Sequence, residues 1–311
     1  MIELRQLRQF IAVAEALSFR RAAERLRMAQ PPLTTTVKRI EAELGVVLFE
    51  RSSRVVRLTE PGRVFLEEAR RTLAQAERAA ESARRAAQGL AGNLRVTFVP
   101  TIAHNLLPRI LRAFRQDHPR IHLDLSEAPS GPQGTALRND YADFGLLVPP
   151  VADSSGLIIE PVLHQELFAA IPADHPLAAL QQVSLADMQD EPWILTPPLQ
   201  APGFYSRIVT ACGKAGFAPR VTQQAIHLDT ILGLIAGRLG VCLVPGLLVY
   251  PRDGVVFRKL RGPGTPVRYE IGAAWRQDDT NPALTAFLKT VRAVMRTAGT
   301  RNPPKARRPA R

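Results

Sequence analysis

One helix-forming segment, residues 31–44, combines side chains that can bind a nucleic acid. On a helical wheel its apolar residues fall within one narrow arc, which must be the buried side: Leu33, Val37, Ile40 and Leu44. The opposite side carries hydroxyls and cations: Thr34, Thr35, Lys38 and Arg39. Threonine can hydrogen-bond to base edges, and Lys or Arg can bind guanine or phosphate. Taken alone, this polar side could equally be a solvated surface, so the neighbouring elements decide its meaning.

Two helices precede this segment and a hairpin follows it. Apolar residues at helical spacing predict a first helix over residues 4–17, and Ser18 is a favourable N-cap for a second helix ending at Arg27. Pro31 and Pro32 are tolerated in the first turn of the third helix, and Gly45 supplies its end. Residues 46–49 and 55–58 are short apolar runs that predict two strands. Residues 1–60 are therefore predicted to form a winged helix-turn-helix domain.

In a winged helix-turn-helix domain, the N-terminal half of the third helix enters the major groove of DNA. We therefore assign DNA contacts to the start and polar side of this helix and to the wing: Gln30, Pro31, Thr34, Thr35, Lys38, Arg39, Arg51 and Arg54. The wing arginines are expected to bind phosphates, which positions the protein without reading sequence.

Residues 61–91 are predicted to form a long linker helix. Seven of its residues follow the alternating three-and-four spacing of a coiled-coil seam: Leu66, Ala69, Leu73, Ala76, Ala80, Ala83 and Ala87. Five of the seven are alanine, so a partner helix could approach closely. The alternative is that this stripe packs on the helix's own domain. We favour a dimer helix, because the segment lies between two domains.

Strands alternate with helices from residue 92 to residue 300. This pattern predicts an open, mostly parallel sheet covered by helices on both faces. The segment is long enough for two lobes joined by crossing strands, which we assign as 92–163 with 266–300 and as 164–265. Residues 301–311 are basic and rich in proline, and we expect a disordered tail.

Positive charge is concentrated at the two ends of the chain. The net charge is +13, and residues 1–90 carry 17 basic against 11 acidic residues. Residues 301–311 add five basic residues and no acidic ones, whereas the middle of the chain is nearly neutral. A basic small domain beside a neutral large one indicates that the small domain binds a polyanion.

Other functional classes find no support in the sequence. Apolar runs are too short for a membrane span, and the N-terminus lacks the pattern of a signal peptide, so we expect a cytoplasmic protein. The two cysteines, Cys212 and Cys242, are expected to be reduced and packed as small hydrophobes. The histidines are scattered without metal-ligand spacing, and no nucleophile or phosphate-loop motif occurs. We therefore predict neither an enzyme nor a cofactor or metal.

The N-terminal 65 residues closely resemble the LysR-type transcriptional regulators. The resemblance is carried by these groups: Glu3-Leu4-Arg5-Gln6-Leu7, Ser18-Phe19, Ala22-Ala23, Ala29-Gln30-Pro31-Pro32-Leu33, Ile40-Glu41, Leu44-Gly45, Leu48-Phe49-Glu50-Arg51 and Leu58-Thr59. A looser resemblance covers the rest of the chain. The resemblance implies a C-terminal region that folds like a type 2 periplasmic binding protein and binds an effector between its lobes. It also implies a linker helix that dimerises, and tetramers are common in the family.

The effector site is predicted partly from the residues and partly from the resemblance. Thr101 and Ser130 each follow a predicted strand and precede a helix, where a helix dipole favours an anion. Leu107 would add apolar contact, and His227 begins a helix that should face the cleft. Pro202 and Phe204 match family positions that contact the effector. Each of these residues could instead be an N-cap or a core residue.

Two positions depart from the family pattern. Thr34-Thr35-Thr36 stands where the family usually has Ser-Arg-Gln, which removes the usual arginine contact to a base at position 35. Relatives that sense dicarboxylic aromatic-breakdown products have an arginine near the position of Val148, and its absence argues against a doubly charged effector.

The sequence thus predicts a DNA-binding transcriptional regulator that is controlled by a small organic acid, possibly aromatic, and self-associates to a dimer or tetramer. One alternative is a regulator that needs no effector. Another is a small-molecule-binding or enzymatic α/β protein with an unrelated helical N-terminus.

Overall fold

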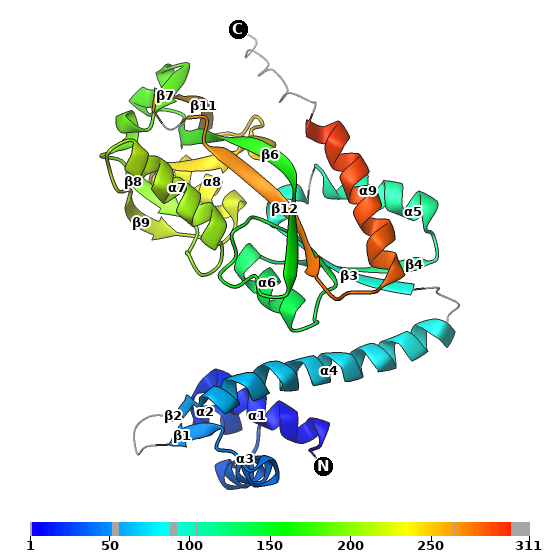
Figure 1. The fold of residues 1–311 in the computed structure, drawn as a ribbon. Coiled ribbons are helices and arrows are strands. Elements are labelled where there is room, and N and C mark those ends of the chain that lie inside the picture. Colours follow the sequence, from blue (N-terminus) through cyan, green and yellow to red (C-terminus); the bar gives the residue numbers. More distant parts are fainter. Residues whose placement is uncertain (1, 52–55, 88–91, 104, 264, 300–311) are drawn as a thin grey trace. The chain divides into compact units, whose positions relative to one another are not determined.

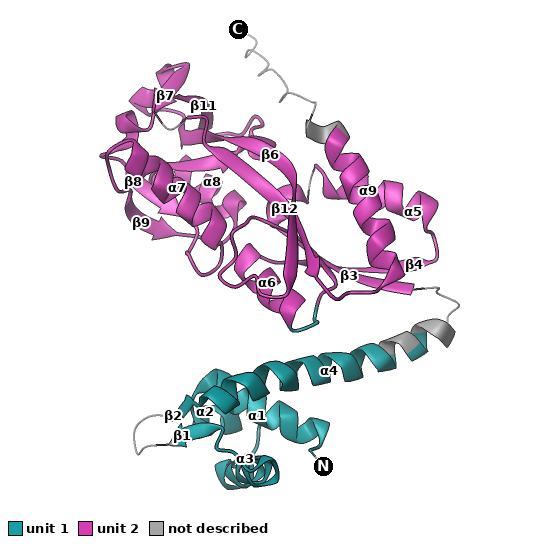
Figure 2. Cartoon of the chain, in the orientation of Figure 1, with its two compact units in different colours: residues 1–89, 139–141 teal, residues 90–138, 142–311 magenta. Residues whose placement is uncertain are grey.

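The computed structural model describes residues 2–51, 56–87, 92–103, 105–263 and 265–299. The chain divides into two compact units, which Figure 2 shows in two colours: residues 1–89 with 139–141, and residues 90–138 with 142–311. The predicted tail, residues 301–311, lies outside the described residues, as does Arg54 of the predicted wing. No helix among the described residues is both long enough and apolar enough to span a membrane.

The first unit is a winged helix-turn-helix followed by a long helix, as predicted (Figure 1). Its elements are α1 (Leu4–Ala16), α2 (Phe19–Arg25), α3 (Gln30–Leu44), β1 (Phe49–Arg51), β2 (Val56–Leu58) and α4 (Glu60–Ala87). The N-cap Ser18 accepts a hydrogen bond from the backbone of Arg21 at 3.4 Å. Gly45 ends α3 in the left-handed region, at φ 68°.

Aromatic rings and the apolar side of α3 form the core of this unit. Phe10 lies 5.3 Å from Phe49 and 4.8 Å from Phe65 between ring centroids, so α1 packs against both the hairpin and α4. Leu33, Val37 and Ile40 are fully buried. Leu44 is 39% exposed, so the prediction that it completes the buried side of α3 was wrong. It is the last residue of the helix, where the core has already ended.

The predicted seam of α4 divides between two environments. Ala69 and Leu73 are buried in the core of the first unit. Ala80 and Ala83, farther along the same helix, are exposed. The first half of the stripe therefore packs on its own domain, which was the alternative reading, and the second half presents small side chains to solvent.

The second unit is a mixed α/β structure in two lobes. Lobe I contains β3 (Gly92–Phe98), α5 (Leu107–Asp117), β4 (Ile121–Glu127), α6 (Ser130–Arg138), β5 (Phe144–Leu147) and α9 (Pro282–Gly299). Lobe II contains β7 (Gln182–Ser184), β8 (Pro192–Leu195), α7 (Pro202–Lys214), β9 (Arg220–Gln224), α8 (Leu228–Ala236), β10 (Cys242–Pro245) and β11 (Val255–Arg261). Short 3-10 turns lie at Pro100–Ile102, Pro176–Ala179, Ala186–Met188 and Gly246–Leu248.

Two long antiparallel strands, β6 (Leu157–Pro172) and β12 (Arg268–Arg276), run through both lobes (Figure 1). They lie inside one sheet of order β4-β3-β5-β12-β6-β11-β7, and β10 also pairs with β6. The prediction of a mostly parallel sheet was wrong, because β12 is antiparallel to both β5 and β6. β6 is continuous over 16 residues and extends from one lobe into the other.

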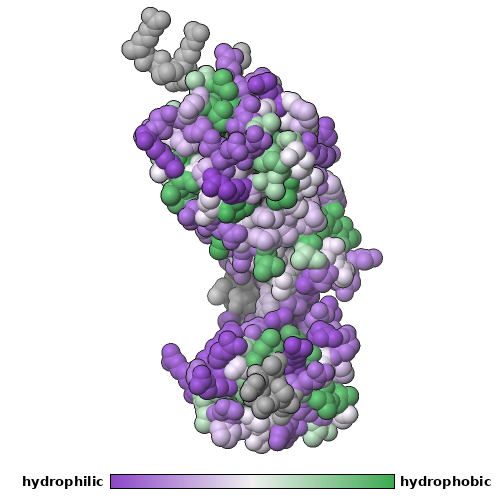
Figure 3. Space-filling view, turned by 90° about the vertical axis from the view of Figure 1, so that its left-hand side faces the viewer, coloured by the Kyte–Doolittle hydropathy of each residue, from purple (hydrophilic) through white to green (hydrophobic). Residues whose placement is uncertain are grey.

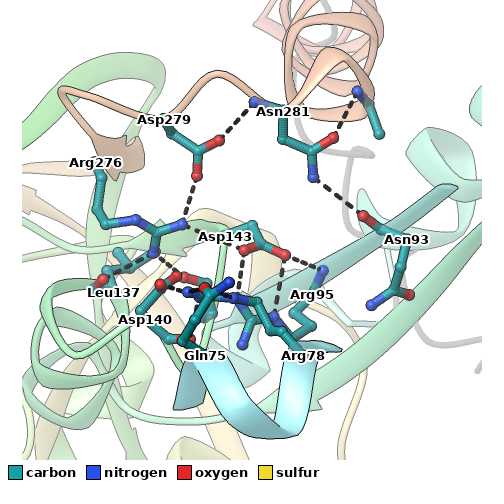
Figure 4. Close-up of polar contacts among 12 residues, drawn as sticks. Gln75, Arg78, Asn93, Arg95, Leu137, Asp140, Asp143, Arg276, Asp279 and Asn281 are labelled. Carbon is teal, nitrogen blue, oxygen red and sulfur yellow. Dashed lines mark hydrogen bonds and ion pairs between the residues drawn. The ribbon is translucent and has the colours of Figure 1, made fainter. Parts of the chain in front are cut away.

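A polar network around the buried Asp143 connects β3, the segment before β5 and the end of β12 (Figure 4). The carboxylate of Asp143 accepts hydrogen bonds from the backbone and guanidinium of Arg95, at 2.8 and 2.5 Å. Arg276 at the end of β12 lies 3.3 Å from the same carboxylate and 2.5 Å from Asp279. Burial alone would raise the pKa of Asp143, but the two arginines outweigh it and hold the pKa below its usual range.

Both cysteines are packed into lobe II and have no special reactivity. Cys212 and Cys242 are buried and unbridged. Burial raises the pKa of each thiol to about 12, so neither forms the reactive thiolate at neutral pH.

Figure 3 shows that the visible face of each unit is largely hydrophilic, with hydrophobic residues in separate patches.

Candidate functional site

The polar side of α3 is accessible, as expected of a helix that enters a DNA groove. Five of the residues predicted to contact DNA are exposed: Gln30, Pro31, Thr35, Lys38 and Arg39. Thr34 is half-buried. Lys38 and Arg39 form no ion pair within the described part of the chain. Their charges are therefore available to phosphates or base edges.

The three threonines of α3 use their hydroxyl protons within the helix. Thr34, Thr35 and Thr36 donate hydrogen bonds to the carbonyls four residues earlier, each at 3.1 Å. This arrangement leaves the hydroxyl oxygen of the exposed Thr35 free to accept. On DNA, the exocyclic amino groups of adenine and cytosine are the major-groove donors that such an oxygen can bind.

Glu41 connects α3 to the hairpin, a role that the sequence analysis did not assign. Its carboxylate accepts hydrogen bonds from the backbone amides of Leu48 and Phe49, at 3.0 and 3.2 Å. Thr59, which follows β2, donates to the carbonyl of Val47, which precedes β1, at 2.7 Å. The base of the hairpin is therefore held in a set position relative to α3. The sequence feature that could have indicated this role is an acidic residue on a helix that was otherwise expected to face DNA.

A small pocket, partly open to solvent, lies between the two lobes of the second unit. Its lining is mostly apolar with a few hydroxyls: Val99, Pro100, Thr101, Pro129, Ser130, Val148, Thr196, Ala201, Phe204, Ile226, Leu228 and Tyr269. None of the described residues that line it has a cationic side chain. An adjoining outer pocket shares Pro100, Thr101 and Leu228 and adds polar residues, among them His227, Glu127 and Asp229.

Three of the six residues predicted for the effector line the inner pocket, namely Thr101, Ser130 and Phe204. His227 lines the outer pocket, where its imidazole lies 3.9 Å from the carboxylate of Glu127. Pro202 begins α7 but lines neither pocket, and its neighbour Ala201 takes that place. Leu107 is buried in the core of the second unit instead. It lies on the inward side of α5, and hydrophobicity alone could not separate a core residue from a pocket residue.

Two hydroxyl groups from distant parts of the chain meet at the pocket. The oxygens of Thr101 and Tyr269 are 3.0 Å apart, and 168 residues separate them in sequence. Burial raises the pKa of Tyr269 to about 12, so the phenol keeps its proton at neutral pH. The two hydroxyl groups together carry two protons. One proton forms the hydrogen bond between them, and the other can be donated to a ligand.

Ser130 supplies a second possible donor. Its oxygen accepts a hydrogen bond from the backbone amide of Val148 at 3.0 Å, and its own proton is not needed for that bond. Thr196 and Tyr269 are lining residues that the sequence analysis missed. Only the packing of the lobes brings them to the pocket, and no local pattern marks either one.

Three helices begin at the pocket wall. Ser130 is the first residue of α6, Ala201 is the N-cap of α7, and Leu228 is the first residue of α8. Thr101 was also expected to precede a helix whose dipole favours an anion. It lies instead in a three-residue 3-10 turn, and α5 begins only at Leu107. The positive ends of helices from both lobes nevertheless surround the pocket, which favours a bound negative charge without a cationic side chain.

Comparison with known proteins identifies both parts of the chain. Residues 4–63 match the family described as "Bacterial regulatory helix-turn-helix protein, lysR family", and residues 87–296 match "LysR substrate binding domain". The HTH-type transcriptional regulator AlsR of Bacillus subtilis is 35% identical over 293 residues, which are 92% of this chain and 94% of AlsR. The Hca operon transcriptional activator HcaR of Escherichia coli is 34% identical, over 93% of this chain and 97% of its own.

Solved structures agree with these relatives. The crystal structure of CbnR, a LysR family transcriptional regulator, superposes with a TM-score of 0.67 at 30% identity, over 94% of this chain and 99% of CbnR. Full-length CbnR in complex with its target DNA gives a TM-score of 0.65, also at 30% identity, over 94% of this chain and 100% of that one.

Proposed function

The chain belongs to the LysR family, as a DNA-binding transcriptional regulator with an effector-binding domain rather than an enzyme, and we propose that a small organic monoanion controls it. The carboxylate of this effector binds between the lobes near Thr101 and Ser130, and its apolar body lies against Phe204. The protein acts in the cytoplasm on double-stranded DNA, and it self-associates.

The DNA-binding part of the proposal is supported by the exposed polar side of α3. Lys38 and Arg39 supply charge without an ion-pair partner among the described residues, and Thr35 offers a hydroxyl oxygen. Gln30 and Pro31 lie at the N-terminal end of the same helix, which is the end that contacts base edges in this type of domain. The wing, which includes Arg51 and Arg54, contacts the phosphate backbone.

The observation that carries the effector proposal is the convergence of three helix N-termini on a pocket without a cation. Helix dipoles and two hydroxyls stabilise one negative charge, whereas a second carboxylate would need a further charged partner. Val148 lines the pocket and is buried, so it places an apolar wall where a second charge would have to lie. Phe204 and Ile226 favour a body that is apolar, such as an aromatic ring.

A test uses benzoate as the monoanion, benzamide as its neutral equivalent and phthalate as its dianionic equivalent, with thermal unfolding of the full-length protein as the readout. We expect stabilisation by benzoate or a related small monocarboxylate, and none by the matched amide. Stabilisation by phthalate that Thr101→Val abolishes would contradict the proposed charge of the ligand between the lobes. A chain that responds to no small acid yet still binds its operator would indicate a regulator without an effector.

Thr101→Val tests the position of the ligand, because it removes the hydroxyl and keeps the shape. We expect binding of the monoanion to weaken by about 1–3 kcal/mol, which is the cost of leaving a buried polar partner without a hydrogen bond. The affinity for DNA without the monoanion should not change. Thr97→Val is the control, since Thr97 is equally buried but does not line the pocket. Calorimetry that finds the same affinity in both variants would place the ligand elsewhere.

A further inference from the structure

A second pocket of the effector-binding unit, separate from the pocket between the lobes, is lined by cations. It has a volume of about 820 Å³, part of it open to solvent, and its lining comes from α7, from the start of β12 and from two loops. The lining residues with polar side chains are Ser206, Arg207, Thr210, Lys214 and Arg268. This pocket thus combines three positive charges with two hydroxyls, whereas the inner pocket between the lobes has hydroxyls and no cation.

Two of these three charges have no protein partner. Lys214 and Arg268 are exposed, and neither forms an ion pair within the described residues. Arg207 has an acidic neighbour, since its guanidinium lies 3.8 Å from the carboxylate of Glu270. The pocket therefore keeps an excess of about two positive charges.

Arg207 is held in place by backbone contacts. Its two terminal nitrogens donate to the carbonyls of Arg268 and Pro149, both at 3.3 Å. Each terminal nitrogen carries a second N–H that these two bonds do not use. A positioned guanidinium of this kind binds carboxylate or phosphate oxygens.

The strand geometry separates this pocket from the one between the lobes. Successive side chains of a strand point to opposite faces. Tyr269 lines the pocket between the lobes, and its neighbour Arg268 lines the cationic pocket. In the same way, α7 contributes Phe204 to the first pocket and Arg207 to the second. The two pockets are therefore distinct, and they share two elements of the fold.

We propose that the cationic pocket is a second ligand site, which binds a small dianion such as a phosphate ester or a dicarboxylate. Two unpaired charges match a doubly charged ligand, and Ser206 and Thr210 can donate to its outer oxygens. The site is independent of the monoanion proposed for the inner pocket, because no residue lines both.

The test measures binding of inorganic phosphate and of succinate to the full-length protein, by calorimetry at constant ionic strength and about pH 8, where phosphate is largely a dianion. We expect at least one of the two to bind, and the double variant Lys214→Gln with Arg268→Gln to weaken that binding about tenfold or more. Binding of phosphate alone or succinate alone identifies the class of dianion. Benzoate serves as the monoanion and should not compete at this site.

The control is Lys289→Gln with Arg115→Gln, which removes the same charge from exposed positions on α9 and α5. It should leave the binding unchanged. Equal weakening in both double variants would overturn the proposal, because it would show a bulk charge effect, and so would the absence of binding by the unaltered protein. Lys214→Gln alone, in the last turn of α7, gives a second variant that retains every hydrogen bond of Arg207 and Arg268 described above.

Discussion

At the scale of single residues, Glu41 shows how a carboxylate can serve a DNA-binding domain without touching DNA. It accepts two backbone hydrogen bonds at the start of the hairpin. We expect Glu41→Ala to destabilise the first unit by about 1.5–3 kcal/mol, the range for hydrogen bonds to a charged group, and to weaken binding to every DNA sequence alike. Glu67→Ala, which removes an exposed charge from α4 of the same unit, is the control. Chemical denaturation and salt-controlled gel shifts would measure both effects. A loss of preference at a single base pair would contradict the positioning role.

Thr35 is the residue for which we expect a direct effect on sequence preference. Its hydroxyl proton is used by the carbonyl of Pro31, so its oxygen should accept from an adenine or cytosine amino group. Thr35→Val should change the preference at one base pair by roughly 1 kcal/mol or less, since a single contact is weaker than a bidentate one. Thr36→Val removes an equivalent internal hydrogen bond and should leave the preference unchanged. Binding to a set of operators with single substitutions checks both variants.

At the scale of elements, α4 uses one apolar stripe for two purposes. Ala69 and Leu73 stabilise the first unit, and Ala80 and Ala83 remain available to a partner. We expect Ala80→Glu with Ala83→Glu to raise the dimer dissociation constant about tenfold or more, because like charges across an interface are strongly unfavourable. Gln75→Glu with Ala79→Glu adds the same charge to exposed positions off the stripe. Analytical ultracentrifugation would detect the difference, and a fully dimeric Ala80/Ala83 variant would exclude this seam.

At the scale of the whole molecule, the network around Asp143 makes the stability of the second unit depend on acid. The folded pKa of Asp143 lies below its unfolded value, so this contribution is present above about pH 4 and is lost as the pH falls through the folded pKa. We expect Asp143→Asn to cost about 3 kcal/mol at neutral pH, because it leaves two half-buried arginines with less countercharge, and the difference from the unaltered protein should shrink below about pH 4. Both tryptophans, Trp193 and Trp275, lie in this unit, so their fluorescence during urea unfolding reports on it alone. A cost that stays constant from neutral pH to about pH 3 would contradict this role.

Local spacing and capping residues were enough to predict the elements of the helix-turn-helix. The helix-turn-helix followed from periodic apolar residues, from Ser18 as an N-cap and from Gly45 as a helix end, and all of these act within a few residues of one another. The polar side of α3 followed in the same way, because a helix of known phase decides which side chains are exposed.

The contacts between distant residues became clear only from the packing of the elements in three dimensions. Thr101 contacts Tyr269 because β12 crosses between the lobes, and Leu107 is buried because it lies on the side of α5 that packs into the core. The same is true of α4, where spacing alone could not show that half of the stripe is already buried by α1. Contacts between residues far apart in sequence depend on how the elements pack, and a periodic pattern contains no information about which partner it will pack against.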